Sequence, residues 1–114
     1  MSTQIVFQDV KNKSEMTYVA SLQASTTPAK VFYVKGYNSG SAQFIQLADA
    51  TALPANATVP LLNIAVGAAS NFTIDFGSVG LDFKNGVSIC NSSTAPTKTI
   101  GSANCQFFVG LTPL

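Results

Sequence analysis

The sequence contains no histidine, no arginine and no tryptophan. Without histidine it lacks the commonest general base, the Ser–His and Cys–His pairs of covalent catalysis and the usual zinc ligand. Without arginine, the six lysines, spread from Lys11 to Lys98, supply no bidentate fork and no basic patch for phosphate. We therefore expect no nucleic-acid partner and no enzyme activity, since any catalysis would depend on carboxylates, lysine or cysteine alone.

Long apolar runs are also absent. A bilayer-spanning helix needs about 20 apolar residues, but the longest apolar-rich region, residues 59–69, is interrupted by Pro60, Asn63 and Gly67. The first four residues, Met-Ser-Thr-Gln, do not begin the basic and then apolar pattern of a secretory signal. The sequence therefore predicts a protein made in a cytoplasm and not inserted in a membrane.

Charged side chains are scarce. They make up 10% of the 114 residues, against about 25% in ordinary soluble domains, while hydrophobic residues make up 46% and the net charge is +1. A chain of this length typically folds as one unit, so we expect residues 1–114 to form a single domain. Two explanations remain for how a protein with so few charges covers its apolar surface. Partner subunits cover it, which we favour, or a neutral coat of Ser, Thr, Asn and Gln covers it without a partner.

Apolar and polar residues alternate with a period of two. In residues 71–76, Phe72, Ile74 and Phe76 share one face, as in a half-buried strand. Residues 105–111 repeat the pattern, but their other face carries Phe108, which we expect to meet a partner or a second sheet. Further β-branched or aromatic runs, bounded by Gly, Pro, Asn or Ser, are residues 31–37, 42–47, 59–66 and 87–90, with weaker candidates at 4–10 and 17–22.

Turn residues separate these runs, as in Asn38-Ser39-Gly40 and Asn85-Gly86. Helical spacing is weak throughout the chain. About eight short strands, with no helices to cover parallel pairs, predict an all-β fold: an antiparallel β-sandwich resembling a jelly roll.

Charge concentrates near the start of the chain, at Asp9, Lys11, Lys13 and Glu15. Two interpretations stay open. Residues 1–15 form an N-terminal arm that is flexible or reaches another subunit, or they include an ordinary edge strand whose charges prevent pairing with other chains.

Asp75 and Asp82 are the acidic pair that a glycosidase or a calcium site would use. Asp75, however, lies on the strand face opposite Phe72 and Phe76, as a solvated strand residue does. The sequence has no phosphate-binding loop, no dinucleotide-binding turn and no clustered metal-ligand spacing. We therefore expect no catalytic, cofactor-binding or metal-ligating residues, and no cofactor.

Cys90 and Cys105 are 14 residues apart and could close a hairpin with a disulfide. Cys105 shares its face with Phe107, whereas Cys90 opposes Ile89, so the two side chains would diverge within one regular sheet. A β-bulge would reverse one of these faces. Because synthesis in a cytoplasm is expected, we favour two reduced thiols.

Tyr33 and Tyr37 lie on one side of a predicted strand and could form a sugar-binding platform. Trp and stacked Tyr dominate such platforms, and Trp is absent. We therefore favour packing or a protein interface for both tyrosines.

Residues 36–47, Gly-Tyr-Asn-Ser-Gly-Ser-Ala-Gln-Phe-Ile-Gln-Leu, resemble small structural proteins of tailed bacteriophages. The similarity continues through Leu53-Pro54-Ala55, Val59-Pro60, the Asn-Phe-Thr-Ile-Asp-Phe-Gly of residues 71–77 and residues 80–94, and covers roughly residues 30 to 111. These are packing and turn residues, so the resemblance carries over no functional residue. It implies a virion β-domain of the kind used in capsid decoration or cement proteins.

The function that this resemblance implies is to stabilise an assembled head by packing over capsomer junctions. The implied partners are the major capsid protein or other virion subunits and further copies of the chain, with a trimer as one arrangement. The implied location is the virion, assembled in the host cytoplasm. We expect residues 4–15 and Phe108 to form the contact surface. A neck, tail or fibre component and a glycan-binding module, centred on Tyr33 and Tyr37, remain as alternatives.

Overall fold

The computed structural model describes residues 11–95 and 97–114, and these residues form nine β-strands. Within this part of the chain there is no helix, and so none able to cross a membrane. The strands are β1 (Lys11–Val19), β2 (Ser21–Ser25), β3 (Ala29–Asn38), β4 (Gln43–Ala48), β5 (Leu62–Val66), β6 (Ser70–Asp75), β7 (Leu81–Phe83), β8 (Val87–Ser92) and β9 (Cys105–Pro113).

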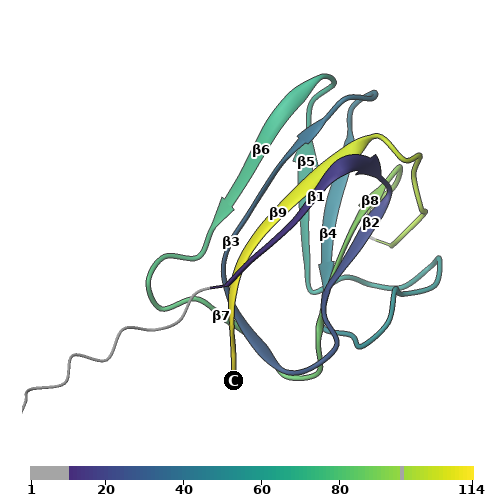
Figure 1. Ribbon diagram of the computed structural model, residues 1–114. Coiled ribbons are helices and arrows are strands. Elements are labelled where there is room, and N and C mark those ends of the chain that lie inside the picture. Colours follow the sequence, from purple (N-terminus) through teal and green to yellow (C-terminus); the bar gives the residue numbers. More distant parts are fainter. Residues whose placement is uncertain (1–10, 96) are drawn as a thin grey trace, which may run out of the picture.

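The strands form two antiparallel sheets that face each other (Figure 1). Sheet A has the order β1-β9-β3-β6, with the short β7 pairing with the first part of β3, and sheet B has the order β2-β8-β4-β5. β4 pairs with β5, β3 with β6, β2 with β8 and β1 with β9, so the chain is one long hairpin rolled into a sandwich. This topology is a jelly roll, and it confirms the fold class predicted from the sequence.

The predicted strands agree with the structure except in their limits. Each strong candidate run contains a strand, but β5 begins at Leu62, and the weak candidate at 17–22 spans the end of β1 and the start of β2. β7 was not predicted. The candidate at residues 4–10 lies outside the described residues.

Residues 11–15 of the predicted arm belong to β1, an edge strand that pairs with β9 from Lys11 opposite Leu111 to Glu15 opposite Phe107. For these five residues the structure matches the edge-strand interpretation. Residues 1–10 lie outside the described part of the chain.

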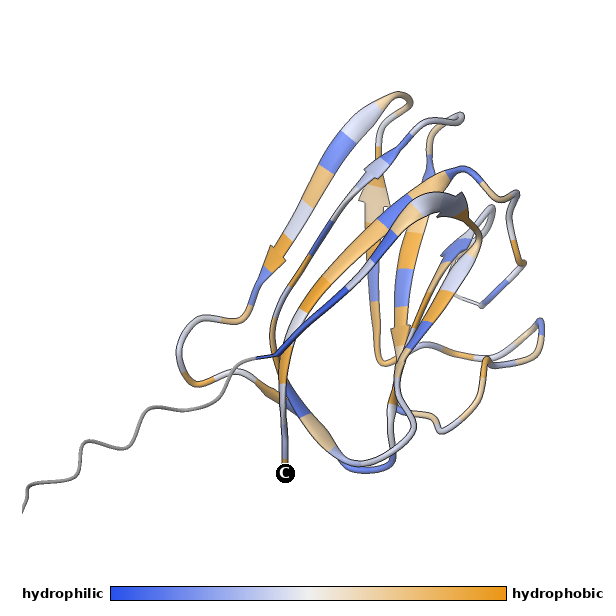
Figure 2. Ribbon diagram, viewed as in Figure 1, coloured by the Kyte–Doolittle hydropathy of each residue, from blue (hydrophilic) through white to orange (hydrophobic). Residues whose placement is uncertain are grey.

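The hydrophobic core lies between the sheets because alternate side chains of each strand point inward. Figure 2 shows this alternation of hydrophobic and hydrophilic residues along the strands. The largest apolar side chains that are fully buried come from both sheets: Phe83, Phe107, Val31, Val34 and Val109 from sheet A, and Ile45, Leu47, Ile89 and Val87 from sheet B.

Gly36 gives two aromatic rings room in this core. It lies in β3 between Phe72 of β6 and Phe107 of β9, whose ring centroids are 6.0 Å apart. A Cβ atom at Gly36 would overlap the carbonyl oxygen of Gln106 and the ring of Phe72. The absence of a side chain at this position therefore allows the two rings to pack across β3.

At one end of the sandwich the core becomes polar. Asn38 donates hydrogen bonds from Nδ2 to the carbonyl oxygens of Ser41 and Gly67, both 2.9 Å long, and its Oδ1 accepts one from Nε2 of Gln43 at 2.7 Å. On the facing strand, Asn91 donates to the carbonyl oxygen of Ser102 at 2.7 Å. These buried amides hold the connections β3–β4, β5–β6 and β8–β9 together.

Replacing Gly36 with alanine is expected to lower the free energy of unfolding by about 3 kcal/mol or more, because backbone and ring atoms occupy the space of the new methyl group. Urea unfolding followed by circular dichroism measures this change. Gly67→Ala is the matched control. Its Cβ would meet the Ser70 side chain, whose hydroxyl is 3.2 Å away, and the substitution should cost less than about 1 kcal/mol. Equal losses in the two variants would contradict the packing described for Gly36.

Candidate interaction surfaces

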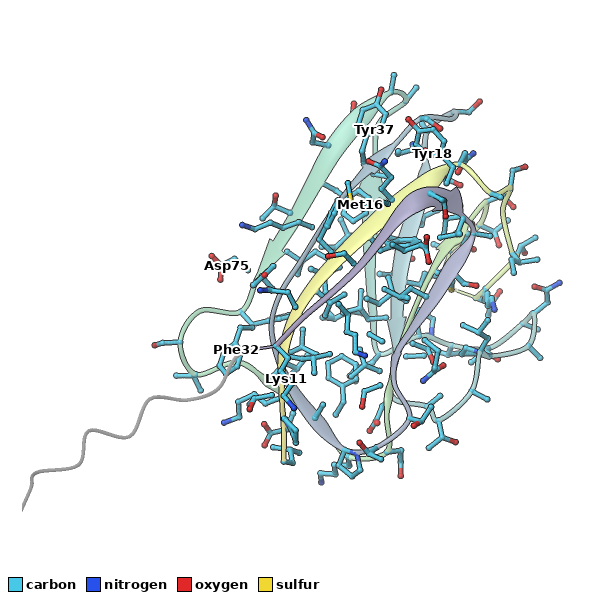
Figure 3. The ribbon with its side chains drawn as sticks, viewed as in Figure 1. Lys11, Met16, Tyr18, Phe32, Tyr37 and Asp75 are labelled. Atoms are coloured by element: carbon cyan, nitrogen blue, oxygen red, sulfur yellow. The ribbon has the colours of Figure 1, made fainter. Side chains whose placement is uncertain are left out.

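No segment of residues 11–95 or 97–114 covers the outer face of sheet A, and several large side chains lie on it. Met16 and Tyr18 of β1 are 70% and 50% exposed. Tyr33 and Tyr37 of β3 and Phe108 of β9 are half-buried and follow the strand positions that face away from the core. Figure 3 shows Met16, Tyr18 and Tyr37 on this side of the molecule.

Part of the contact surface predicted from the sequence is assembled on this face. Ser14 of β1 lies directly opposite Phe108 of β9, so the start of β1 and the outward Phe108 are neighbours in the sheet. The charged Lys11, Lys13 and Glu15 lie opposite the core residues of β9 and therefore on the other face of β1. Beside them is a shallow groove of about 270 Å³ lined by residues of β3, β6 and β9, including Tyr37, Asn71 and Phe108. The exposed Met16 and Tyr18 were not singled out from the sequence as members of this surface, because a strand's outer residues show no signal of what covers them.

Tyr33 already has contacts within the chain. Its ring fills the space that a side chain at Gly110 would occupy, and the Lys35 ammonium lies 4.8 Å from the ring centroid. Its hydroxyl donates a hydrogen bond to Oδ1 of Asn12 on β1. These contacts favour a packing role for Tyr33, which bridges three strands of sheet A, over a free platform for sugar rings.

The outer face of sheet B, in contrast, is covered by residues 49–61 and by the described residues of a second loop, 93–95 and 97–104, which together we call the loop layer. The loops bond to each other: Ala57 donates its N–H to the Lys98 carbonyl at 2.7 Å, and Lys98 donates its N–H to the Thr58 carbonyl at 2.8 Å. Gln46 of β4 bonds to the carbonyl of Thr94 at 3.2 Å. As a result the outward side chains of β8, including Ser88, are buried.

Lys98 is the unusual residue of the loop layer, because it is a lysine with only 4% of its surface exposed. Its Nζ donates a hydrogen bond to the carbonyl oxygen of Pro54 in the other loop. Beside it, Cys90 and Gln46 line a small cavity of about 10 Å³, and Oε1 of Gln46 is buried with no hydrogen-bond partner among the described residues. The Lys98 side chain therefore fastens the two loops together above sheet B.

Apolar side chains project from the loop layer to solvent. They are Leu53 (48% exposed), Val59 (71%), Leu61 (52%) and Ile100 (46%). The scarcity of charge noted in the sequence is therefore matched by two apolar surfaces, one on the outer face of sheet A and one on the loop layer.

Asp75 and Asp82, the acidic pair considered for a glycosidase or a calcium site, each contact other residues of the fold. Asp75 accepts a hydrogen bond from the N–H of Gly77 at 2.7 Å, and Asp82 lies 3.7 Å from Lys30 Nζ. Partial burial raises the pKa of Asp49. The carboxylate accepts hydrogen bonds from backbone N–H groups, the strongest effect coming from Asn85, and the charge of Lys84 lies nearby. These interactions outweigh the burial and hold the pKa of Asp49 below its usual 3.8. Within the described residues no group of three or more His, Cys, Asp or Glu side chains is placed to hold a metal ion.

The two cysteines are free thiols on different sheets. Cys90 lies on β8 beneath the loop layer, and Cys105 lies on β9 in the core. Burial raises the pKa of the Cys90 thiol, and the nearby charge of Lys98 opposes this only in part. Burial also raises the pKa of the Cys105 thiol, opposed by a hydrogen bond from Asn91. Both thiols are thus held protonated and weakly nucleophilic, in agreement with the expectation of two reduced thiols.

No protein-family model matches the chain, and no curated protein matches its sequence. Among solved structures, the chain is similar to the coat protein of Tobacco streak virus, with a TM-score of 0.54 and 10% sequence identity. The match covers 94% of this chain and 89% of that one. At this identity the likeness concerns the fold alone, and the resemblance to proteins of tailed bacteriophages stays a prediction.

Replacing Lys98 with alanine should release the loop layer, because it removes the bond to Pro54 and the packing of the lysine stem. We expect a loss of about 2 kcal/mol in unfolding free energy and faster amide exchange in residues 55–58, while amides of the core strands stay protected. Hydrogen exchange measured by mass spectrometry tests both parts. The exposed Lys84→Ala control should change stability by less than about 0.5 kcal/mol, and unchanged exchange in Lys98→Ala would show that Lys98 does not hold the loops.

Proposed function

We propose that this chain is a virion structural protein, and that it decorates an assembled capsid by packing over the junctions between capsomers. The observation that carries the proposal is the likeness in fold to a viral coat protein over 94% of the chain. It agrees with the sequence resemblance, which implies a virion β-domain on separate grounds. Jelly rolls are also a common architecture of viral capsid domains.

The surfaces of the molecule support a role in packing. Met16 and Tyr18 on sheet A, and Val59 on the loop layer, are apolar side chains that a soluble monomer gains nothing by exposing. They lie on opposite sides of the sandwich, which suits a subunit that contacts a shell and neighbouring copies at once. The partners in this proposal are the major capsid protein or other virion subunits and further copies of the chain, and the proposal includes no enzymatic step.

For the surface that meets the shell we propose the outer face of sheet A around β1 and Phe108. The preceding residues 4–10 belong to the same proposed contact, on sequence grounds alone. Stabilisation would come from mass action: a protein that binds only the assembled state lowers the free energy of that state as its own concentration rises above its dissociation constant.

The copy number of the chain in purified particles tests its place in the virion. Quantitative mass spectrometry against the major shell protein should give a ratio near parity or a simple fraction such as about one third, as symmetric decoration requires. A ratio lower by roughly one or two orders of magnitude would place the chain in the neck, tail or fibres instead. Absence from the particles would refute the virion proposal.

The surface that meets the shell is tested by the double variant Met16→Ser, Tyr18→Ser. Losing two apolar contacts should weaken binding to purified shells by at least about 10-fold, measured by co-sedimentation. The control is Leu53→Ser, which makes a similar change on the loop layer and should leave binding unchanged. If only the Leu53 variant loses binding, the loop layer is the surface that meets the shell.

A further inference from the structure

Apart from the three-residue β7, the described sandwich has four edge strands, β1, β6, β2 and β5, and they differ in how they are protected. β1 carries Lys11, Lys13 and Glu15 and has a register shift against β9, and β2 has a register shift against β8. Inward-pointing charges and bulges are devices that keep an edge from pairing with another chain. β6 has neither, since its register with β3 is regular along its whole length and its only charge is Asp75 at its end. At the margin of sheet A, the edge of β6 that faces away from β3 is not paired with any strand of the described residues (Figure 1), and we call it the open edge.

The hydrogen bonds to β3 determine which residues of β6 face this edge. Phe76 donates its N–H to the carbonyl of Phe32 at 2.8 Å, so these two residues form a hydrogen-bonded pair of the antiparallel ladder. Every second pair along the ladder is of the same kind, so Ile74 and Phe72 also direct their N–H and C=O groups toward β3. The residues between them, which direct these groups to the open edge, are Asn71, Thr73 and Asp75.

We propose that two copies of this chain associate through their β6 strands, paired antiparallel about a twofold axis at Thr73. In this register Thr73 faces Thr73 of the second copy, and Asn71 of each copy faces Asp75 of the other. All three are pairs whose backbone groups point to the open edge, so each exchanges two hydrogen bonds across the contact. The unpaired backbone groups of β6 are satisfied in one arrangement.

The side chains fit the register that the backbone imposes. The outer side chains of β6 are exposed, and they would form one Thr–Thr pair and two Asn–Asp pairs, each able to form a hydrogen bond across the strands. Asp75 projects outward at the end of β6 (Figure 3). The two copies of this carboxylate would lie at opposite ends of the contact, about 14 Å apart, so they do not repel each other closely.

The occupant of the edge is a second copy because β6 complements itself in this register. β5, the other edge with a regular register, carries no charge, is one residue shorter and presents only Asn63 and Ala65 on its outer face. The inference rests on the self-association included in the proposed function, and it does not depend on where in a virion the chain lies. A contact of this type is isologous and closes as a dimer.

A cysteine at the twofold axis tests the register directly. In Thr73→Cys the two new thiols would face each other with Cα atoms about 5.5 Å apart, within the range of a disulfide. Mild oxidation should therefore yield a covalent dimer on a non-reducing gel, while the native Cys90 and Cys105 are buried. Asp75→Cys is the matched control and should stay monomeric on the same gel. Equal cross-linking of the two variants, or none in Thr73→Cys, would overturn the proposed register.

Charge at Asn71 gives a second, independent test on the full chain. Analytical ultracentrifugation at about 100 µM, suited to a small contact of micromolar affinity, should show a dimer of the 11.9 kDa chain. Asn71→Lys places a cation opposite Asp75 and should strengthen the dimer, whereas Asn71→Asp places like charges opposite and should weaken it, with a difference of at least about 10-fold in dissociation constant. Circular dichroism checks that both variants are folded. A monomer, a trimer or equal constants would overturn the dimer.

The outcomes separate this inference from the proposed function. A chain that is abundant in particles but monomeric in solution keeps the decoration role and loses the β6 contact. A β6 dimer of a chain absent from particles does the reverse.

Discussion

The arrangement of this jelly roll depends on the buried amides at the end of the sandwich where the connections β3–β4, β5–β6 and β8–β9 meet. Asn38 and Asn91 are fully buried there, one on each sheet, and their amides bond to the carbonyl groups of loops. Apolar residues at these positions would leave those carbonyls without donors, and each buried unsatisfied group costs about 1–3 kcal/mol. The amides thus fix the paths of three loops and, through them, the position of one sheet over the other.

The two outer faces of the sandwich have different properties. In the described part of the chain, sheet A is covered only by its own side chains. The Tyr33 ring lies over Gly110 and its hydroxyl bonds to Asn12, so the face is rigid and continuous. Sheet B lies under the loop layer, which depends on Lys98 and on a few bonds between loops. A surface built on strands keeps its shape when it binds, whereas a surface built on loops can adjust. The molecule therefore offers one fixed and one adaptable apolar surface.

The sequence predicts the fold well because alternation is a local signal. In residues 71–76 the period of two follows from the geometry of one strand with one face buried, and the structure confirms it. β8 shows the limit of this signal: Val87 and Ile89 face the core, but Ser88 and Cys90 are equally buried beneath the loop layer. Nothing in the local pattern indicates that distant loops cover an outer face. The exposure of Met16 and Tyr18, and the burial of Lys98, depend in the same way on contacts between segments far apart in the chain, which a single sequence does not record.

Because charge is scarce, the edges of the sheets determine how copies of the chain associate. A net charge of +1 with 10% charged residues gives little electrostatic repulsion between copies, so association must be controlled by shape and by backbone hydrogen bonds. The charges that the chain does have are placed accordingly: three of the described ones lie on the edge strand β1, in register with the apolar Leu111, Val109 and Phe107. Charges at such positions oppose pairing with any strand that would continue the core. With β1 protected in this way, and β2 interrupted by its register shift, β5 and β6 are the longer edge strands of the described residues whose regular register allows a sheet to grow. A chain that assembles through such an edge limits its own growth, because an isologous contact uses the edge in both partners at once and leaves neither free for a third.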